Sequence, residues 1–189
     1  NRTRYNIRVV NISLGHPVGE SYTTDPLCRA IENLVSSGVV VVVSAGNYGR
    51  LGYGSVTSPG ISPSAITVGA FNDRNTLDTS DDTITTYSSR GPTWPDHFLK
   101  PDLLAAGNRV VSLRASGYID SNCPGKRLRP SDYSPDPAVV GKTGAYFEMS
   151  GTSMAAPLVS GTVALMLQKD PTLSPATVKA RLMKSARKT

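Results

Sequence analysis

The 189-residue sequence predicts an α/β protein, a parallel β-sheet flanked by helices. Short apolar strand patterns alternate with helical ones along the chain. Residues 39–44 are apolar at all but the last position, as in a strand that is buried on both faces of a sheet. Hydrophobic residues make up 39% and charged residues 18% of the chain, which is enough for a globular core. The longest apolar run, residues 38–43, is far shorter than the roughly 20 residues that cross a bilayer, so no membrane partner is expected.

The first elements follow from periodicity. Residues 8–13 read as a strand, and residues 39–44 are the buried strand. Between them, residues 26–37 have apolar side chains at helical spacing. The predicted inward face of this helix consists of Leu27, Ile31, Leu34 and Val35.

The middle of the chain predicts three more strands and a long loop. Residues 65–70 form one strand, and residues 102–106 and 109–113 form two that a Gly-Asn turn separates. Residues 117–144 contain four prolines and several charges, so we expect a long surface excursion there.

Regular structure returns near the end of the chain. Residues 145–149 read as a strand, followed by an apolar helix over residues 152–168. The last helix begins at Ser174 and Pro175, an N-cap followed by proline at the first helical position. No internal repeat or linker interrupts the chain, which predicts one compact unit.

Residues 150–157 (SGTSMAAP) carry the densest chemical signal. A strand ends, a tight turn of small residues follows, and Ser153 stands where the apolar helix begins. Free backbone N–H groups and the helix dipole favour negative charge there, which suits a tetrahedral oxyanion. An ordinary Ser/Thr helix cap is the alternative for this segment alone.

Residues 44–47 (SAGN) carry the second signal. Asn47 follows the buried strand, where its amide is a fixed donor that can point into a cleft, as an oxyanion hole requires. A simple Gly-Asn turn is the alternative.

Together these segments resemble the subtilisin-like serine proteases (subtilases), and the resemblance covers nearly the whole chain. Residues 151–157 look like the nucleophile motif of that family, residues 45–47 like its oxyanion motif, and residues 11–15 (NISLG) like its substrate-binding strand. The character of the sequence is closest to the bacterial AprX-like subgroup. Further segments at familiar spacings are residues 56–60, 66–70, 87–92 and 100–103.

The resemblance implies a three-layer sandwich that is incomplete at its N-terminal side, with residues 1–189 as the C-terminal portion of a single peptidase domain. It implies a serine endopeptidase that forms an acyl-enzyme on Ser153, with Asn47 as the side-chain donor to the oxyanion. The polypeptide substrate would lie between two backbone edges above a roomy apolar pocket. The residues implied in substrate binding are Ser13, Leu14, Gly15, Ser44, Ala45, Gly46 and Thr57.

The sequence departs from the family pattern in its catalytic partners. The family triad runs Asp, His, Ser along the chain, and its Asp and His motifs precede the substrate-binding strand. His16 and His97 match neither motif and are expected in surface loops. We therefore expect a fragment or cleaved portion, whose partner is the N-terminal half of the same domain supplying Asp and His. A peptide-binding pseudoprotease is the alternative.

No cofactor is required by this chemistry. Residues 72–82 (NDRNTLDTSDD) are rich in oxygen ligands and could hold a structural Ca²⁺, which subtilases often bind, but they lack an EF-hand pattern, which favours a solvated turn. Residues 141–143 (GKT) copy the end of a nucleotide-binding loop. Asp136 stands at its first glycine position, which speaks against nucleotide binding.

The net charge of +6 and the two cysteines are less informative. A nucleic-acid surface is one interpretation of the charge, but cations in the last turns of a helix also complement its dipole, so no nucleic-acid partner is expected. Cys28 and Cys123 could form one bridge or stay free. With only two histidines, they predict no metal site. The cations that cluster near the C-terminus are Lys179, Arg181, Lys184, Arg187 and Lys188.

Overall fold

The computed structural model describes residues 2–115, 117–136 and 144–188. Contacts along the chain define two units, Asn1–Asn108 with Gly151–Thr189, and Arg109–Ser150. The sequence analysis expected one compact unit, because neither a linker nor a change of composition marks these boundaries. The assignment of the whole chain to a single peptidase domain stays a prediction.

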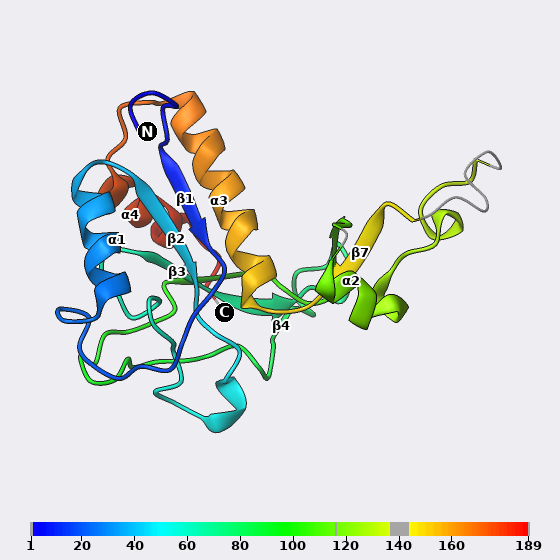
Figure 1. The fold of residues 1–189 in the computed structure, drawn as a ribbon, viewed down its shortest axis with the longest axis horizontal. Coiled ribbons are helices and arrows are strands. Elements are labelled where there is room, and N and C mark those ends of the chain that lie inside the picture. Colours follow the sequence, from blue (N-terminus) through cyan, green and yellow to red (C-terminus); the bar gives the residue numbers. More distant parts are fainter. Residues whose placement is uncertain (1, 116, 137–143, 189) are drawn as a thin grey trace. The chain divides into compact units, whose positions relative to one another are not determined.

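The first unit is built on a sheet whose long strands are all parallel (Figure 1). β1 (Val9–Ile12) pairs with β2 (Val40–Ser44), β2 with β3 (Ile66–Asn72), and β3 with β5 (Leu103–Ala106). β4 (Thr83–Ile84) runs antiparallel to the end of β3. The predicted strands are confirmed, and β4 was not foreseen.

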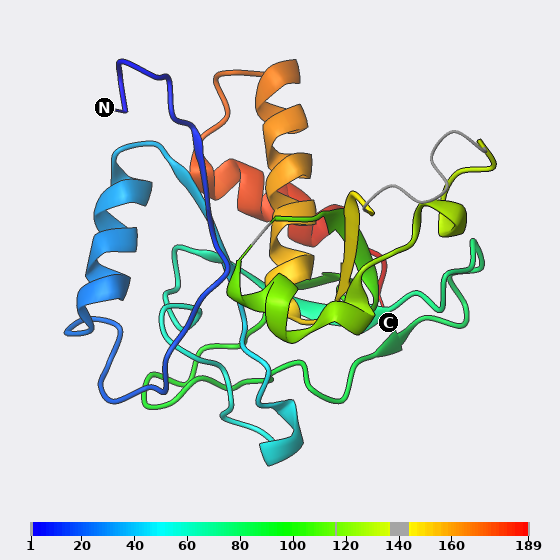
Figure 2. The same ribbon diagram turned by 45° about the vertical axis from the view of Figure 1, so that its right-hand side comes forward.

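Helices cover both faces of this sheet, so the predicted α/β sandwich is confirmed (Figures 1 and 2). α1 (Pro26–Ser36) lies on one face, and α3 (Thr152–Lys169) and α4 (Pro175–Ser185) on the other. Alternate valines of β2 point to opposite faces of the sheet. Val41 and Val43 pack on the α1 side, and Val40 and Val42 on the α3 side.

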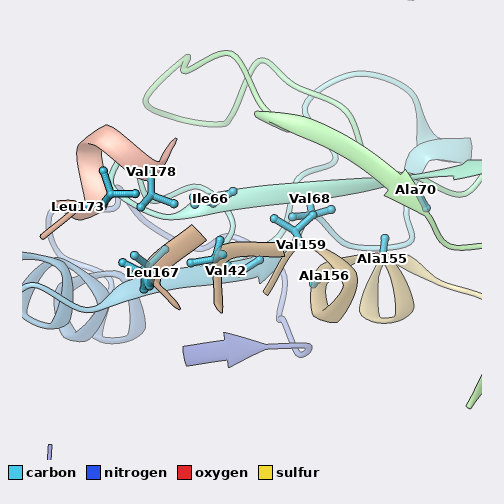
Figure 3. Packing of buried hydrophobic residues seen from close by; sticks show 12 residues of the cluster. Val42, Ile66, Val68, Ala70, Ala155, Ala156, Val159, Leu167, Leu173 and Val178 are labelled. Atoms are coloured by element: carbon cyan, nitrogen blue, oxygen red, sulfur yellow. The ribbon is translucent and has the colours of Figure 1, made fainter. Parts of the chain in front are cut away.

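The core beneath α3 is made of small and branched side chains (Figure 3). Ala155 and Ala156 are fully buried, which brings the helix close to the sheet. Val42 and Val68 from the strands and Val159 from the helix fill the same layer. Burying a valine or leucine side chain contributes roughly 1.5–3 kcal/mol, so this layer is a main source of stability.

The two shorter helices of the first unit, α1 and α4, begin at side-chain caps. The Asp25 carboxylate accepts a hydrogen bond from the Cys28 N–H at 2.9 Å, and Ser174 caps α4, as predicted, through the Thr177 N–H at 3.2 Å. The predicted inward face of α1 is correct at Ile31, which is buried, but Leu27 remains 40% exposed.

The second unit is a hairpin with a short helical excursion. β6 (Val110–Leu113) pairs antiparallel with β7 (Tyr146–Met149). The predicted surface excursion contains α2 (Tyr118–Asn122) and the 3-10 turns η2 (Pro124–Lys126) and η3 (Pro130–Asp132). The nucleotide-loop resemblance at residues 141–143 lies outside the described residues.

Both cysteines are free thiols. Cys28 is buried, and burial raises the pKa of its thiol to about 12, whereas Cys123 is exposed. In the described segments of the chain, no helix is both long and apolar enough to cross a bilayer.

Candidate active site

The first turn of α3 carries Ser153, which is half-buried. Gly151 precedes the helix with a φ of 153°, and a Cβ there would lie 3.3 Å from Asn47 Nδ2. The Gly151 N–H donates to the Gly107 carbonyl at 2.8 Å. The same carbonyl accepts from the Tyr87 hydroxyl at 2.7 Å, and burial raises the pKa of Tyr87. The turn before Ser153 is therefore held firmly against the sheet.

Asn47 follows β2 and reaches the same helix end. Its Oδ1 accepts from the backbone N–H of Thr152 at 2.9 Å and from the Thr152 hydroxyl at 3.1 Å. The Gly46 N–H donates in turn to the Thr152 hydroxyl at 3.1 Å. These bonds fix which end of the amide faces Thr152. The donor group of the side chain, Nδ2, is therefore at the other end. Thr152 lies within the motif of residues 151–157, and its bonds to Asn47 were not predicted from the sequence.

Ser13 lies at the end of β1 and contacts Ser153 twice. The Ser153 hydroxyl donates to the Ser13 carbonyl at 3.3 Å, and the Ser13 hydroxyl donates to the Ser153 carbonyl at 2.9 Å. Together with the Asn47 contacts, these bonds bring Ser13, Asn47 and Ser153 to one end of α3. Leu14, the next residue, is exposed.

Thr57 lies between the two segments that were expected to bind the substrate. A Cβ on Gly15 would lie 2.5 Å from Thr57 Oγ1, and one on Gly46 would lie 2.8 Å from it. The Thr57 N–H donates to the Ala45 carbonyl at 3.0 Å. Ser44, Ala45 and Thr57 are buried. Gly15 and Gly46 thus flank a buried threonine, while the substrate-binding roles stay predictions.

The two histidines make their contacts elsewhere. His16 exchanges backbone hydrogen bonds with Ser58, and its Nε2 lies 3.7 Å from Asp25 Oδ2. His97 lies in a loop, where its N–H donates to the Thr93 carbonyl. Among the described residues, the hydrogen bonds of the Ser153 side chain involve Ser13 and no histidine.

Side chains of residues 72–82 make hydrogen bonds within the loop and an ion pair outside it. Asn72 and Asp73 accept hydrogen bonds from nearby backbone N–H groups, and Asp81 accepts from the Thr76 hydroxyl. Asp82 pairs with Arg187. Throughout the described part of the chain, no three His, Cys, Asp or Glu residues are grouped to hold a metal ion. These hydrogen bonds hold the turns of the loop.

The fold and this site define a class of protein: an α/β sandwich with a serine at a helix N-terminus and an asparagine amide beside it. The chain belongs to the subtilase family, whose sequence pattern it matches over residues 2–189. This match confirms the family resemblance of the motifs.

Individual relatives agree with this membership. Serine protease AprX of Bacillus subtilis (strain 168) is 44% identical over 159 residues, which are 84% of this chain, and this supports the resemblance to the AprX-like subgroup. Subtilisin of Bacillus pumilus is 36% identical over 182 residues, or 96% of this chain. A cold adapted subtilisin-like serine proteinase has a TM-score of 0.60 at 29% identity over 94% of this chain, and the S41 psychrophilic protease has 0.66 at 27% over 98%.

The chain spans only part of these relatives. It covers 32% of AprX, 50% of the Bacillus pumilus subtilisin, and 48% and 51% of the two solved structures.

Proposed function

We propose that the protein to which this chain belongs is a serine endopeptidase with Ser153 as its nucleophile. The observation that supports this most is the pair of hydrogen bonds from Thr152 to Asn47 Oδ1, directly beside Ser153. The pair leaves Asn47 Nδ2 to act as a donor. Asn47 Nδ2 and the Ser153 N–H would hold the oxyanion, since the first N–H groups of a helix have no intrahelical acceptor.

In the reaction, a histidine takes the proton of the Ser153 hydroxyl while its oxygen attacks the peptide carbonyl. The tetrahedral intermediate collapses as the histidine gives that proton to the leaving amine, and an acyl-enzyme remains. Water, activated by the same histidine, then hydrolyses the ester and restores Ser153. None of these steps requires a cofactor.

We propose that the Asp and His come from the N-terminal half of the same protease domain. Three features of the first unit support a segment that covers it. α3 leaves two large apolar side chains exposed, Leu158 at 47% and Leu165 at 67%. β1 is an edge strand of the sheet, and covering such an edge with another segment is one way in which proteins prevent unwanted pairing there. A groove of about 340 Å³ lies beside β1, lined by residues that include Ile12, Leu27 and Leu34.

The substrate would be a polypeptide that pairs through its backbone with residues 13–15 and 44–46. Extended peptides add to exposed strand edges in this way, with side-chain pockets providing specificity. The buried Thr57 between Gly15 and Gly46 would form the base of such a pocket.

A peptide-binding pseudoprotease is the second candidate. The contacts of His16 and His97 favour it, because the hydrogen bonds described for the two histidines do not involve Ser153. This candidate predicts that peptides bind without being cleaved.

Serine-directed fluorophosphonate labelling tests the proposal, because the reagent requires an activated serine. We expect negligible labelling of the 189-residue chain alone, since loss of the histidine in subtilisin itself costs about 10⁶ in turnover. Labelling should return when the N-terminal half is added, and it should vanish in Ser153→Ala but persist in the surface control Ser36→Ala.

Two outcomes would contradict the proposal. Strong labelling of the chain alone would show that His16 or His97 serves as the base. A complex of both halves that binds peptides but never reacts would establish the pseudoprotease instead.

A further inference from the structure

Pro157 leaves the nucleophile's own carbonyl without its usual helical partner. In an α-helix each carbonyl accepts from the N–H four residues further on. For Ser153 that residue is Pro157, which lies inside α3 and has no N–H. The first turn of α3 therefore lacks a backbone hydrogen bond at the residue that carries the reacting hydroxyl.

The Ser13 hydroxyl supplies a donor at this point. It donates to the Ser153 carbonyl at 2.9 Å, across 140 residues of sequence. A hydroxyl has a single proton, so this contact forms only when that proton points toward α3.

Asn11 sets the direction of that proton. Its Nδ2 donates to Ser13 Oγ at 2.8 Å, so the Ser13 hydroxyl accepts from Asn11 and keeps its proton for Ser153. The Ser160 hydroxyl has two acceptors within reach, Asn11 Oδ1 at 3.0 Å and the Ala156 carbonyl at 3.1 Å. When its proton points to Asn11, it fixes the end of the amide that faces Ser13. Donors and acceptors thus run in one direction from Ser160 through Asn11 and Ser13 to Ser153.

We propose that Asn11 is a positioning residue for the nucleophile. Through the Ser13 hydroxyl it provides the hydrogen bond that Pro157 cannot, and so holds the first turn of α3 and the Ser153 side chain in place. This inference rests on the proposed function of Ser153. The hydrogen bonds of the Asn11 amide go to Ser13 and Ser160, so we infer that it acts on Ser153 through Ser13.

The first test uses the assembled protease, with both halves of the domain. Asn11→Ala removes the donor to Ser13. Asn11→Asp replaces it with an acceptor toward which the Ser13 hydroxyl would turn. We expect either change to slow fluorophosphonate labelling about three- to tenfold, the effect of one ordinary hydrogen bond. For peptide substrates kcat should fall by the same factor with KM unchanged. Asn33→Ala, at an exposed position of α1, is the matched control and should have no effect.

The second test restores the missing donor. Pro157→Ala places an N–H four residues after Ser153, where it can donate to the Ser153 carbonyl and replace the Ser13 hydroxyl. In this background Asn11→Ala should slow labelling less than twofold, measured against Pro157→Ala alone. An equal loss in both backgrounds would overturn the proposal, because a general destabilisation would not depend on residue 157.

A third readout does not depend on activity. The ¹³C shift of the Ser153 carbonyl in the isolated chain reports the hydrogen bond from Ser13. It should move in Asn11→Ala and in Ser13→Ala but not in Asn33→Ala. An unmutated protease that never labels would refute the proposed function, whereas an unmoved carbonyl shift would refute the role of Asn11.

Discussion

Asn47 Oδ1 accepts two hydrogen bonds from Thr152, one from the backbone N–H at 2.9 Å and one from the hydroxyl at 3.1 Å. The two residues are 105 positions apart and belong to different elements, the loop after β2 and the start of α3. An amide held by two donors on its oxygen cannot exchange its two ends without losing both bonds. The orientation of the proposed oxyanion donor is therefore set by Thr152.

Thr152→Val should lower kcat of the assembled protease about three- to tenfold with little change in KM. The substitution keeps the shape and the N–H but removes one donor to Asn47 and the acceptor for the Gly46 N–H. Thr152→Ser retains the hydroxyl and should retain the rate. Asn47→Leu should cost about 10²–10³, the value known for this donor in subtilisin itself. Equal rates for Thr152→Val and Thr152→Ser would show that the hydroxyl has no orienting role.

A peptide library should show preference for large apolar or aromatic side chains at the cleaved position. The pocket base is a buried threonine between two glycines, and burying an apolar side chain there contributes roughly 1.5–3 kcal/mol. Gly15→Ala would bring a Cβ to 2.5 Å from Thr57 Oγ1 and should weaken this preference. A firm preference for acidic side chains would contradict the expected pocket.

Leu165→Glu should weaken association with the N-terminal half of the domain. Leu165 is 67% exposed on α3, the helix that we propose is covered by that segment, and a carboxylate there would have to be desolvated. Leu77→Glu is the matched control, since Leu77 is fully exposed in a loop. Titration of the labelled N-terminal half against each variant measures the change. Equal affinities for the two variants would place the interface elsewhere.

The pH dependence of stability should reveal the buried Lys100. Burial lowers the pKa of Lys100 to about 8, although its Nζ lies 2.7 Å from Asp102 Oδ2. Between pH 8 and its ordinary value of 10.5, the unfolded chain therefore binds more protons than the folded one. The contribution of this group to the free energy of unfolding consequently rises with pH across that window.

Urea denaturation at pH 8, 9 and 10 measures that slope. Lys100→Met should lose the rising contribution, and Lys184→Met, at an exposed position of α4, should keep it. Equal slopes in the unmutated chain and in Lys100→Met would contradict the assignment.

Acid should loosen the second unit only at very low pH. The hydrogen bonds from Arg114, together with those from Arg127, lower the pKa of Asp120 to about 2. The folded pKa lies below the ordinary 3.8, so the stabilising contribution is complete above pH 4 and is lost as pH falls through 2. The ¹³Cγ shift of Asp120 measures this titration. Arg114→Gln should raise the midpoint of the Asp120 titration toward 3.8, whereas Arg181→Gln, at an exposed position, should leave it unchanged. A midpoint near 3.8 in the unmutated chain would contradict the hydrogen bonds from Arg114 and Arg127 to Asp120.

Much of the first unit could be predicted because its helices and strands bury apolar side chains at regular spacings. The valine run of β2 and the Ser174–Pro175 start of α4 were both recognisable from local sequence. β4 was not, because two residues carry no periodicity. The boundary of the second unit was missed because Arg109–Ser150 begins and ends next to strands of ordinary composition.

The candidate site, too, could be predicted only in part. Ser153 and Asn47 stood in recognisable motifs at the ends of predicted elements. The roles of Asn11 and Thr152 depend on hydrogen bonds across 105 to 149 residues, which only the packed sheet and helix create. Lys100 likewise could not be recognised as buried, because its Nζ donates to the carbonyl of Ala65, which is 35 residues away in the sequence.

The long-range hydrogen bonds around Ser153 can form only late in the synthesis of the chain. β1, β2 and Asn47 leave the ribosome well before α3, so the strand that we propose pairs with substrate is synthesised before Ser153. The links from Ser13 to Ser153 and from Asn47 to Thr152 close only when α3 docks on the finished sheet. The proposed serine site is therefore assembled only after α3 has been synthesised and has packed on the sheet.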